Sequence, residues 1–92
     1  MVTATRISKL VGVSEEEVIT KSLLSFIERE IRLAEADIAD IRERYSVLSK
    51  EELYEAIKSL KIASNPAWED YTVWKNKERY IVDLKEQLKL GR

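Results

Sequence analysis

The sequence predicts an all-α fold: a long helical hairpin made of a long helix, a short connecting helix and a long return helix. Charged residues make up 36% of the 92-residue chain, and two glycines and one proline leave little turn chemistry. The most informative pattern is an apolar run in alternating steps of three and four residues, which marks one face of a helix. We call this run the seam, and its members are Leu24, Ile27, Ile31, Ala34, Ile38, Ile41, Tyr45 and Leu48.

We expect one helical domain over residues 1–92 with a small core. Its first element, residues 1–13, is an N-terminal arm or short helix that Gly12 ends. The long helix follows over residues 14–46. Ser14 and Glu17 have the spacing of a capping box, and no glycine or proline interrupts the chain from there to Tyr45.

The long helix is not uniform along its length. Its first half carries a second apolar row beside the seam, formed by Ile19, Leu23 and Phe26. Its second half has the seam alone, with Leu33 as an outlier. We therefore expect the first half to be buried on two sides and the second half on one.

Two shorter signals predict the remaining helices. Ser49 and Glu52 form a second capping box, which starts a short helix over residues 49–63 with a buried stripe of Leu53, Ala56, Ile57 and Leu60. Asn65 is a good N-cap and Pro66 suits the first helical position, so the return helix covers residues 65–90. Its stripe is Trp68, Tyr71, Trp74, Ile81, Leu84 and Leu88.

The return helix has a charged gap in its stripe at Lys77 and Glu78. If it folds antiparallel onto the long helix with Trp68 beside Tyr45, the gap falls near Ala34, the smallest seam residue. Beside so small a residue, the aliphatic part of a long charged side chain can lie along the apolar surface. This fit favours a seam within one chain over an intermolecular coiled coil, and it leaves the second apolar row as a candidate homodimer surface.

The residue inventory argues against an enzyme. Histidine and cysteine are both absent, which excludes Ser-His-Asp and thiol nucleophiles and the commonest metal ligands. Asp37 and Asp40 share a helix face, and we interpret them as solvated charges, with Asp40 paired to Arg44 at i, i+4. We therefore predict no catalytic residue, no cofactor and no metal.

Nucleic acid and membrane are not favoured as partners. The net charge is −1, and no run approaches the roughly twenty apolar residues of a membrane span. The N-terminus lacks the apolar region of a signal peptide, so we expect a cytoplasmic protein. Residues 75–80 mix basic side chains with a tyrosine, which we interpret as an ordinary exposed helix face. Charge-rich, cysteine-free helices also suit a thermophile.

The aromatic residues of the return helix have two interpretations. Trp68, Tyr71 and Trp74 have the spacing of a helix core, but Trp and Tyr are also enriched at the centres of protein interfaces. Both interpretations hold if a core is shared between chains. The candidate partner or oligomer interface is therefore Ile19, Leu23, Phe26, Trp68, Tyr71 and Trp74.

Two family resemblances add expectations. Residues 7–19, ISKLVGVSEEEVI, resemble the middle of ribbon-helix-helix regulators, whose helices meet at an "LGVS-x-x-E-V-I" turn. That family reads the DNA major groove with a paired β-strand. If the N-terminal arm of this chain binds DNA, we expect Arg6, Lys9 and Lys21 to contact phosphates.

A broader resemblance covers about residues 14–88. It is carried by Glu28-Arg29-Glu30-Ile31, Tyr45, Ser49 to Leu53, and Asn65-Pro66-Ala67-Trp68-Glu69-Asp70 with Trp74. These motifs resemble small helical antitoxin-like proteins of prokaryotic type II toxin–antitoxin pairs, found mainly in archaea and thermophiles. The resemblance implies a role in binding a protein partner.

We therefore expect a non-enzymatic, antitoxin-like protein-binding module that neutralises a small protein partner through helical apolar surfaces. The chain is also expected to bind itself as a homodimer. The alternatives are a DNA-binding transcriptional regulator that uses the N-terminal arm, and a structural homo-oligomeric coiled-coil protein.

Overall fold

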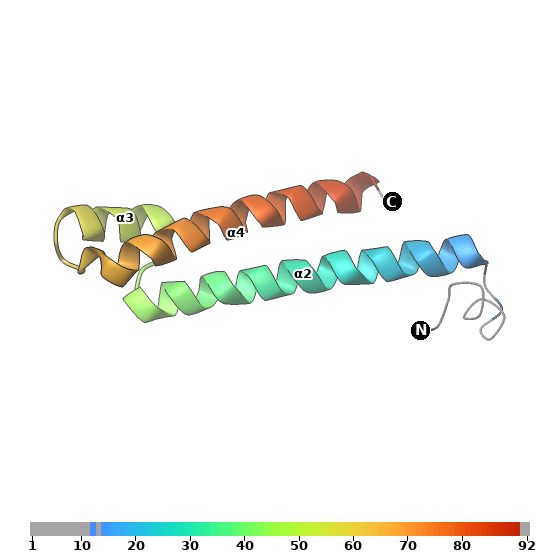
Figure 1. The fold of residues 1–92 in the computed structure, drawn as a ribbon, viewed down its shortest axis with the longest axis horizontal. Helices are drawn as coiled ribbons and strands as arrows, with labels where there is room; N and C mark the ends of the chain where they lie inside the picture. Colours follow the sequence, from blue (N-terminus) through green and yellow to red (C-terminus); the bar gives the residue numbers. More distant parts are fainter. Residues whose placement is uncertain (1–11, 13, 91–92) are drawn as a thin grey trace.

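The computed structural model describes Gly12 and residues 14–90, and within them the chain is an all-α hairpin. Helix α2 (Glu15–Tyr45) leads through the short α3 (Lys50–Lys58) into the return helix α4 (Ser64–Leu90). Figure 1 shows α4 lying beside α2, with the first turns of α2 extending past the end of α4 and with α3 packed where the chain turns back. The predicted helical hairpin is confirmed, while the expected N-terminal element, residues 1–13, lies outside the described residues except for Gly12. We call the α3 end of the hairpin the closed end and the opposite end the open end.

Helix α2 begins and ends at recognisable caps. Ser14 Oγ accepts a hydrogen bond from the backbone N–H of Glu17 at 3.0 Å, as the capping-box spacing predicts. At the other end Ser46 takes a left-handed conformation with φ 53°. The N–H of Ser46 bonds to the carbonyl of Glu43, and the N–H of Val47 bonds to that of Arg42. This is a Schellman motif with serine where glycine is usual.

Helix α3 is shorter than predicted. Its start at Ser49 is confirmed, because the Ser49 hydroxyl accepts from the N–H of Glu52 at 3.1 Å. Its end is at Lys58 rather than 63, because Leu60 adopts φ 62° and the N–H of Lys61 turns back to the carbonyl of Ala56. Leu60 consequently leaves the helix and is 86% exposed, so its assignment to the buried stripe was wrong.

Helix α4 is irregular in its first turn. Its second residue, Asn65, has an extended backbone with φ −119° and ψ 121°, which separates Ser64 from the regular part of the helix. This conformation is that of a residue preceding a helix, and Pro66 follows at the first regular position. The predicted start at Asn65 therefore agrees with the break in the backbone.

The core lies toward the closed end, where all three helices meet. Trp74 and Leu53 are its largest fully buried side chains. The buried cluster contains Ile38, Ile41, Val47, Leu53, Ile57, Ala67 and Trp74, with Tyr45, Ile62, Tyr71 and Ile81 packed against it. Helix α4 presents Ala67, and not Trp68, to this core, because Ala67 is fully buried while Trp68 is 48% exposed.

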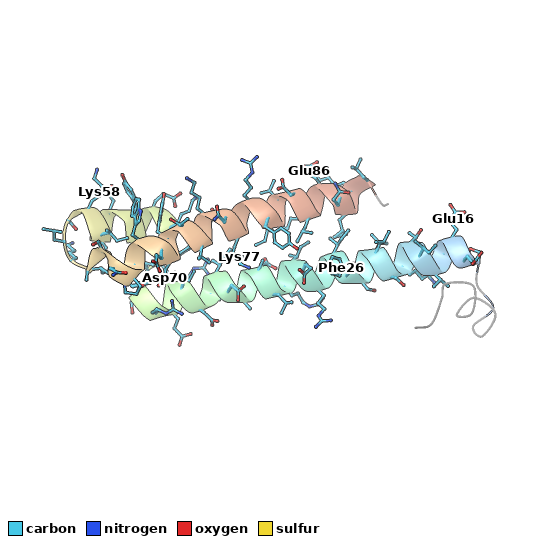
Figure 2. All side chains as sticks on the ribbon, in the orientation of Figure 1. Glu16, Phe26, Lys58, Asp70, Lys77 and Glu86 are labelled. Atoms are coloured by element: carbon cyan, nitrogen blue, oxygen red, sulfur yellow. The ribbon has the colours of Figure 1, made fainter. Side chains whose placement is uncertain are left out.

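Polar contacts fix the antiparallel register of α2 and α4. Lys77 Nζ lies 3.2 Å from Asp37 Oδ2, and the Tyr80 hydroxyl donates to Glu30 Oε1 at 3.0 Å. Ala34 is 2% exposed in the packed seam. The seam from Ile31 to Tyr45 therefore packs within one chain, whereas Leu48 lies beyond the end of α2 and is 82% exposed, so its assignment to the seam was wrong. Lys77 lies one helical turn from the place predicted for the charged gap (Figure 2).

Candidate protein-binding surfaces

Helix α2 carries an uncovered apolar row toward the open end. The first half of this helix was expected to be buried on two sides. In the single chain, however, the row is exposed: the exposed fractions are 51% for Ile19, 57% for Leu23 and 57% for Phe26. Leu33, two turns beyond Phe26, is 50% exposed on the same side of the helix. We call these four residues the α2 stripe. Figure 2 shows Phe26 on α2, well away from the closed end.

A groove lies where α4 ends beside the α2 stripe. It has a volume of about 380 Å³ and is lined by Thr20, Leu23, Leu24, Ile27, Gln87 and Leu90. A second hollow of about 460 Å³ follows along the first turns of α2, and the two share Thr20 and Leu24. The open end therefore offers a hollowed apolar surface rather than a closed core.

An aromatic cluster forms the second surface, at the closed end. Trp68 and Tyr71 are one turn apart on α4 and stack with ring centroids 5.3 Å apart and planes at 19°. Tyr54 of α3 tilts against both, at 5.9 Å from Trp68 and 5.5 Å from Tyr71. Lys58 Nζ lies 5.4 Å from the centre of the Tyr54 ring. The aromatic cluster consists of Tyr54, Trp68 and Tyr71.

Trp74 does not belong to either surface. It is 1% exposed, its ring faces the Arg42 guanidinium at 5.4 Å, and its indole N–H donates to Glu78 Oε1 at 3.1 Å. Of the six candidate interface residues, Trp74 alone is buried in the single chain, where it is part of the core. The sequence pattern did not separate the two tryptophans because both positions fit helical spacing.

Tyr54 was not among the residues predicted to form a binding surface. Tyr54 follows Leu53, the fully buried residue of α3, so its side chain points about a quarter turn away from the core. Its contact with Trp68 joins two helices and cannot be read from either helix alone. The signal available in the sequence was an aromatic residue placed beside, rather than on, the α3 stripe.

Ion pairs and hydrogen bonds hold the two long helices around these surfaces. Asp70 accepts from the Tyr45 hydroxyl and pairs with Arg44 Nη1 at 2.9 Å. Partial burial and the hydrogen bond to Asp70 raise the pKa of Tyr45 above its ordinary value. At the α3 end, Lys50 Nζ bridges Glu51 at 2.7 Å and Glu78 at 2.9 Å, which raises the pKa of Lys50. Arg44 thus pairs with Asp70, and not with Asp40 as predicted.

The candidate nucleic-acid contacts do not gather into a site within the described residues. Arg6 and Lys9 lie outside them, and Lys21 is exposed on α2. In the basic segment 75–80, Lys77 is paired with Asp37 and Tyr80 with Glu30. Part of that segment therefore contacts α2.

The described residues contain no cluster of three or more carboxylates that could hold a metal ion. Over the same residues, no buried polar side-chain atom lacks a hydrogen-bond partner, and no helix is long and apolar enough to cross a membrane. What the arrangement provides is apolar and aromatic surface suited to non-covalent binding.

A family model described as "Uncharacterized protein MJ0235 family" matches residues 1–90. The chain belongs to this family. The match extends over all three helices and the segment before them. No curated protein and no solved structure matches the chain.

Proposed function

We propose that this chain is a non-enzymatic protein-binding module whose aromatic cluster is the anchor for a protein partner. The observation that carries the proposal is Trp68, which is 48% exposed although two tyrosines hold its ring. A large aromatic side chain that is exposed and already ordered loses little conformational entropy when a partner covers it. Such side chains supply much of the binding energy at protein interfaces.

The surroundings of the aromatic cluster suit a protein surface. Lys58 lies over Tyr54, and Glu69 and Thr72 are exposed next to Trp68 on α4. Charges of both signs around an aromatic centre resemble the polar rim of an interface. Asp70, one turn from the core residue Trp74, holds this part of α4 against α2 through Tyr45 and Arg44. These contacts hold in place the part of α4 that carries Trp68.

The narrower form of the proposal concerns the identity of the partner. The resemblance to antitoxin-like proteins implies a small toxin in the cytoplasm, whose active surface the chain would cover. In that form the chain acts by steric blockade and needs no catalytic group, cofactor or metal.

The test is a comparison of matched variants in affinity capture from a lysate of the source organism, with bound proteins identified by mass spectrometry. Wild type is expected to retain one stoichiometric protein that Trp68→Ala loses. Leu48→Ala is the control, because Leu48 is 82% exposed and lies in the connection between α2 and α3, outside the cluster. Equal retention by wild type and Trp68→Ala, or no retained protein, would contradict the proposal.

A further inference from the structure

The hairpin is a single layer of helices over most of its length. Its extents are 60 × 25 × 16 Å, and one helix with its side chains is already about 10–12 Å across. Domains are ordinarily built from at least two packed layers, which lets each helix bury its apolar face. Helix α3 provides a third packing element at the closed end. Along the rest of α2, the α2 stripe has no covering layer among the described residues.

Three of the four residues of the α2 stripe are symmetric about Phe26, and the fourth, Leu23, has Arg29 at its symmetric position. Ile19 and Leu33 lie seven residues before and after Phe26, which is two turns or about 10 Å in each direction. An antiparallel copy of the same helix, related by a two-fold axis at Phe26, would place Ile19 of each chain against Leu33 of the other. It would place the two Phe26 side chains against each other. Two-fold interfaces require this kind of self-complementary surface.

We propose that a second copy of this chain covers the α2 stripe, forming an antiparallel homodimer with Phe26 at the two-fold axis. The residues beside the stripe favour this arrangement. The antiparallel register sets Arg29 opposite Leu23 and Glu30 opposite Ser22, so that no like charges meet there. A parallel pair in register would set Glu30 against its own copy, which is unfavourable.

The ends of the paired segment are also compatible. In this register Glu15 of one chain comes level with Asp37 of the other. Asp37 is already paired with Lys77 at 3.2 Å, so a carboxylate that approaches it meets an ion pair and not an isolated negative charge.

The exposed apolar area is more than half of the area that a stable dimer buries per chain. The four stripe residues and Tyr80, which bonds to Glu30 beside them, are 38–57% exposed. At roughly 200 Å² for a large side chain, these fractions sum to about 500 Å² per chain. A stable interface buries about 800 Å² per partner, and the remainder would come from the polar rim. The aromatic clusters stay free at opposite ends of the dimer, so this proposal does not depend on the proposed function.

Sedimentation velocity over a range of concentrations tests the proposal, with circular dichroism to confirm helicity. Wild type is expected to be a dimer. Phe26→Asp is expected to weaken dimerisation about 1000-fold, because the two-fold axis places the substituted residue twice in one interface. The control is Val82→Asp, since Val82 is also 57% exposed but lies on α4 away from the stripe. A monomeric wild type, or equal effects of the two variants, would overturn the proposal.

Cysteine substitution tests the register without relying on a disruptive charge. The chain has no native cysteine. Phe26→Cys is expected to form a disulfide-linked dimer under mild oxidation, whereas Ile19→Cys forms one only when mixed with Leu33→Cys. Cross-linking of Ile19→Cys with itself in preference to Leu33→Cys would indicate parallel chains and overturn the antiparallel arrangement.

Discussion

Tyr45, in the last turn of α2, donates its hydroxyl hydrogen to Asp70, in the second turn of α4. Arg44 pairs with the same carboxylate at 2.9 Å. This contact joins the two long helices beside the core, and Asp70 lies in the chain between Trp68 and Tyr71 of the aromatic cluster. Because the Asp70 side chain is only 18% exposed, these two partners supply hydrogen bonds that water would otherwise make to its carboxylate.

Removing the tyrosine hydroxyl should measure the strength of this contact. Tyr45→Phe keeps the ring against the core and removes one hydrogen bond to a partly buried carboxylate, so the free energy of unfolding should fall by about 1–2 kcal/mol. Urea denaturation followed by circular dichroism checks this. Tyr80→Phe is the control, because its hydrogen bond to Glu30 is exposed and its loss should cost less. An unchanged urea midpoint for Tyr45→Phe would mean that the hydroxyl contributes no stability.

Stability should also fall at alkaline pH. Burial and the bond to Asp70 raise the pKa of Tyr45, so its protonated form is favoured in the folded chain. The resulting stability is fully present below the unfolded pKa of 10.0 and is lost as pH rises through the higher folded pKa. The raised pKa of Tyr80, caused first by its bond to Glu30, acts in the same direction.

The measurement for this effect is the urea midpoint of wild type and Tyr45→Phe on both sides of pH 10. Wild type should lose more stability than the variant across that range. A larger loss in Tyr45→Phe would contradict the assignment to Tyr45.

Replacing Leu60 should stabilise the folded chain. Leu60 holds φ 62° and is 86% exposed, so it combines an unfavourable backbone conformation with little buried area. Leu60→Gly should raise the free energy of unfolding by about 0.5–1 kcal/mol, because glycine adopts the left-handed conformation freely. Leu48→Gly is the matched control. It should lower stability slightly, because glycine increases the conformational entropy of the unfolded chain without relieving a left-handed backbone in the folded chain. Destabilisation by Leu60→Gly in thermal melts would argue against the capping geometry.

The two tryptophans should contribute very differently to stability. Trp74→Ala removes a fully buried ring and should cost about 3–5 kcal/mol of stability. Trp68→Ala, at a half-exposed position, should cost much less. Thermal denaturation of the two variants gives the comparison. Similar losses from both would mean that Trp68 is a core residue rather than a binding surface.

Local sequence signals predicted most of the fold. The capping residues Ser14 and Ser49 and the three-four spacing of the α2 seam determine where helices begin and which face is buried. These features depend on residues within a few turns of one another, so one helix at a time is enough to recognise them.

The features that the sequence could not predict depend on contacts between helices. The end of α3 was missed because Leu60 occupies a position where glycine would have marked the stop. The choice of Ala67 over Trp68 for the core is a rotation of about 100°, which only the packing against α2 and α3 decides. The aromatic cluster requires Tyr54 of α3 to meet two residues of α4.

The most direct measurement is the affinity of the captured partner for wild type, Trp68→Ala and Phe26→Asp by isothermal titration calorimetry. If the aromatic cluster is the anchor, Trp68→Ala should weaken binding about 30-fold or more, while Phe26→Asp keeps the wild-type affinity per chain. Wild-type affinity in Trp68→Ala would contradict a binding role for the aromatic cluster.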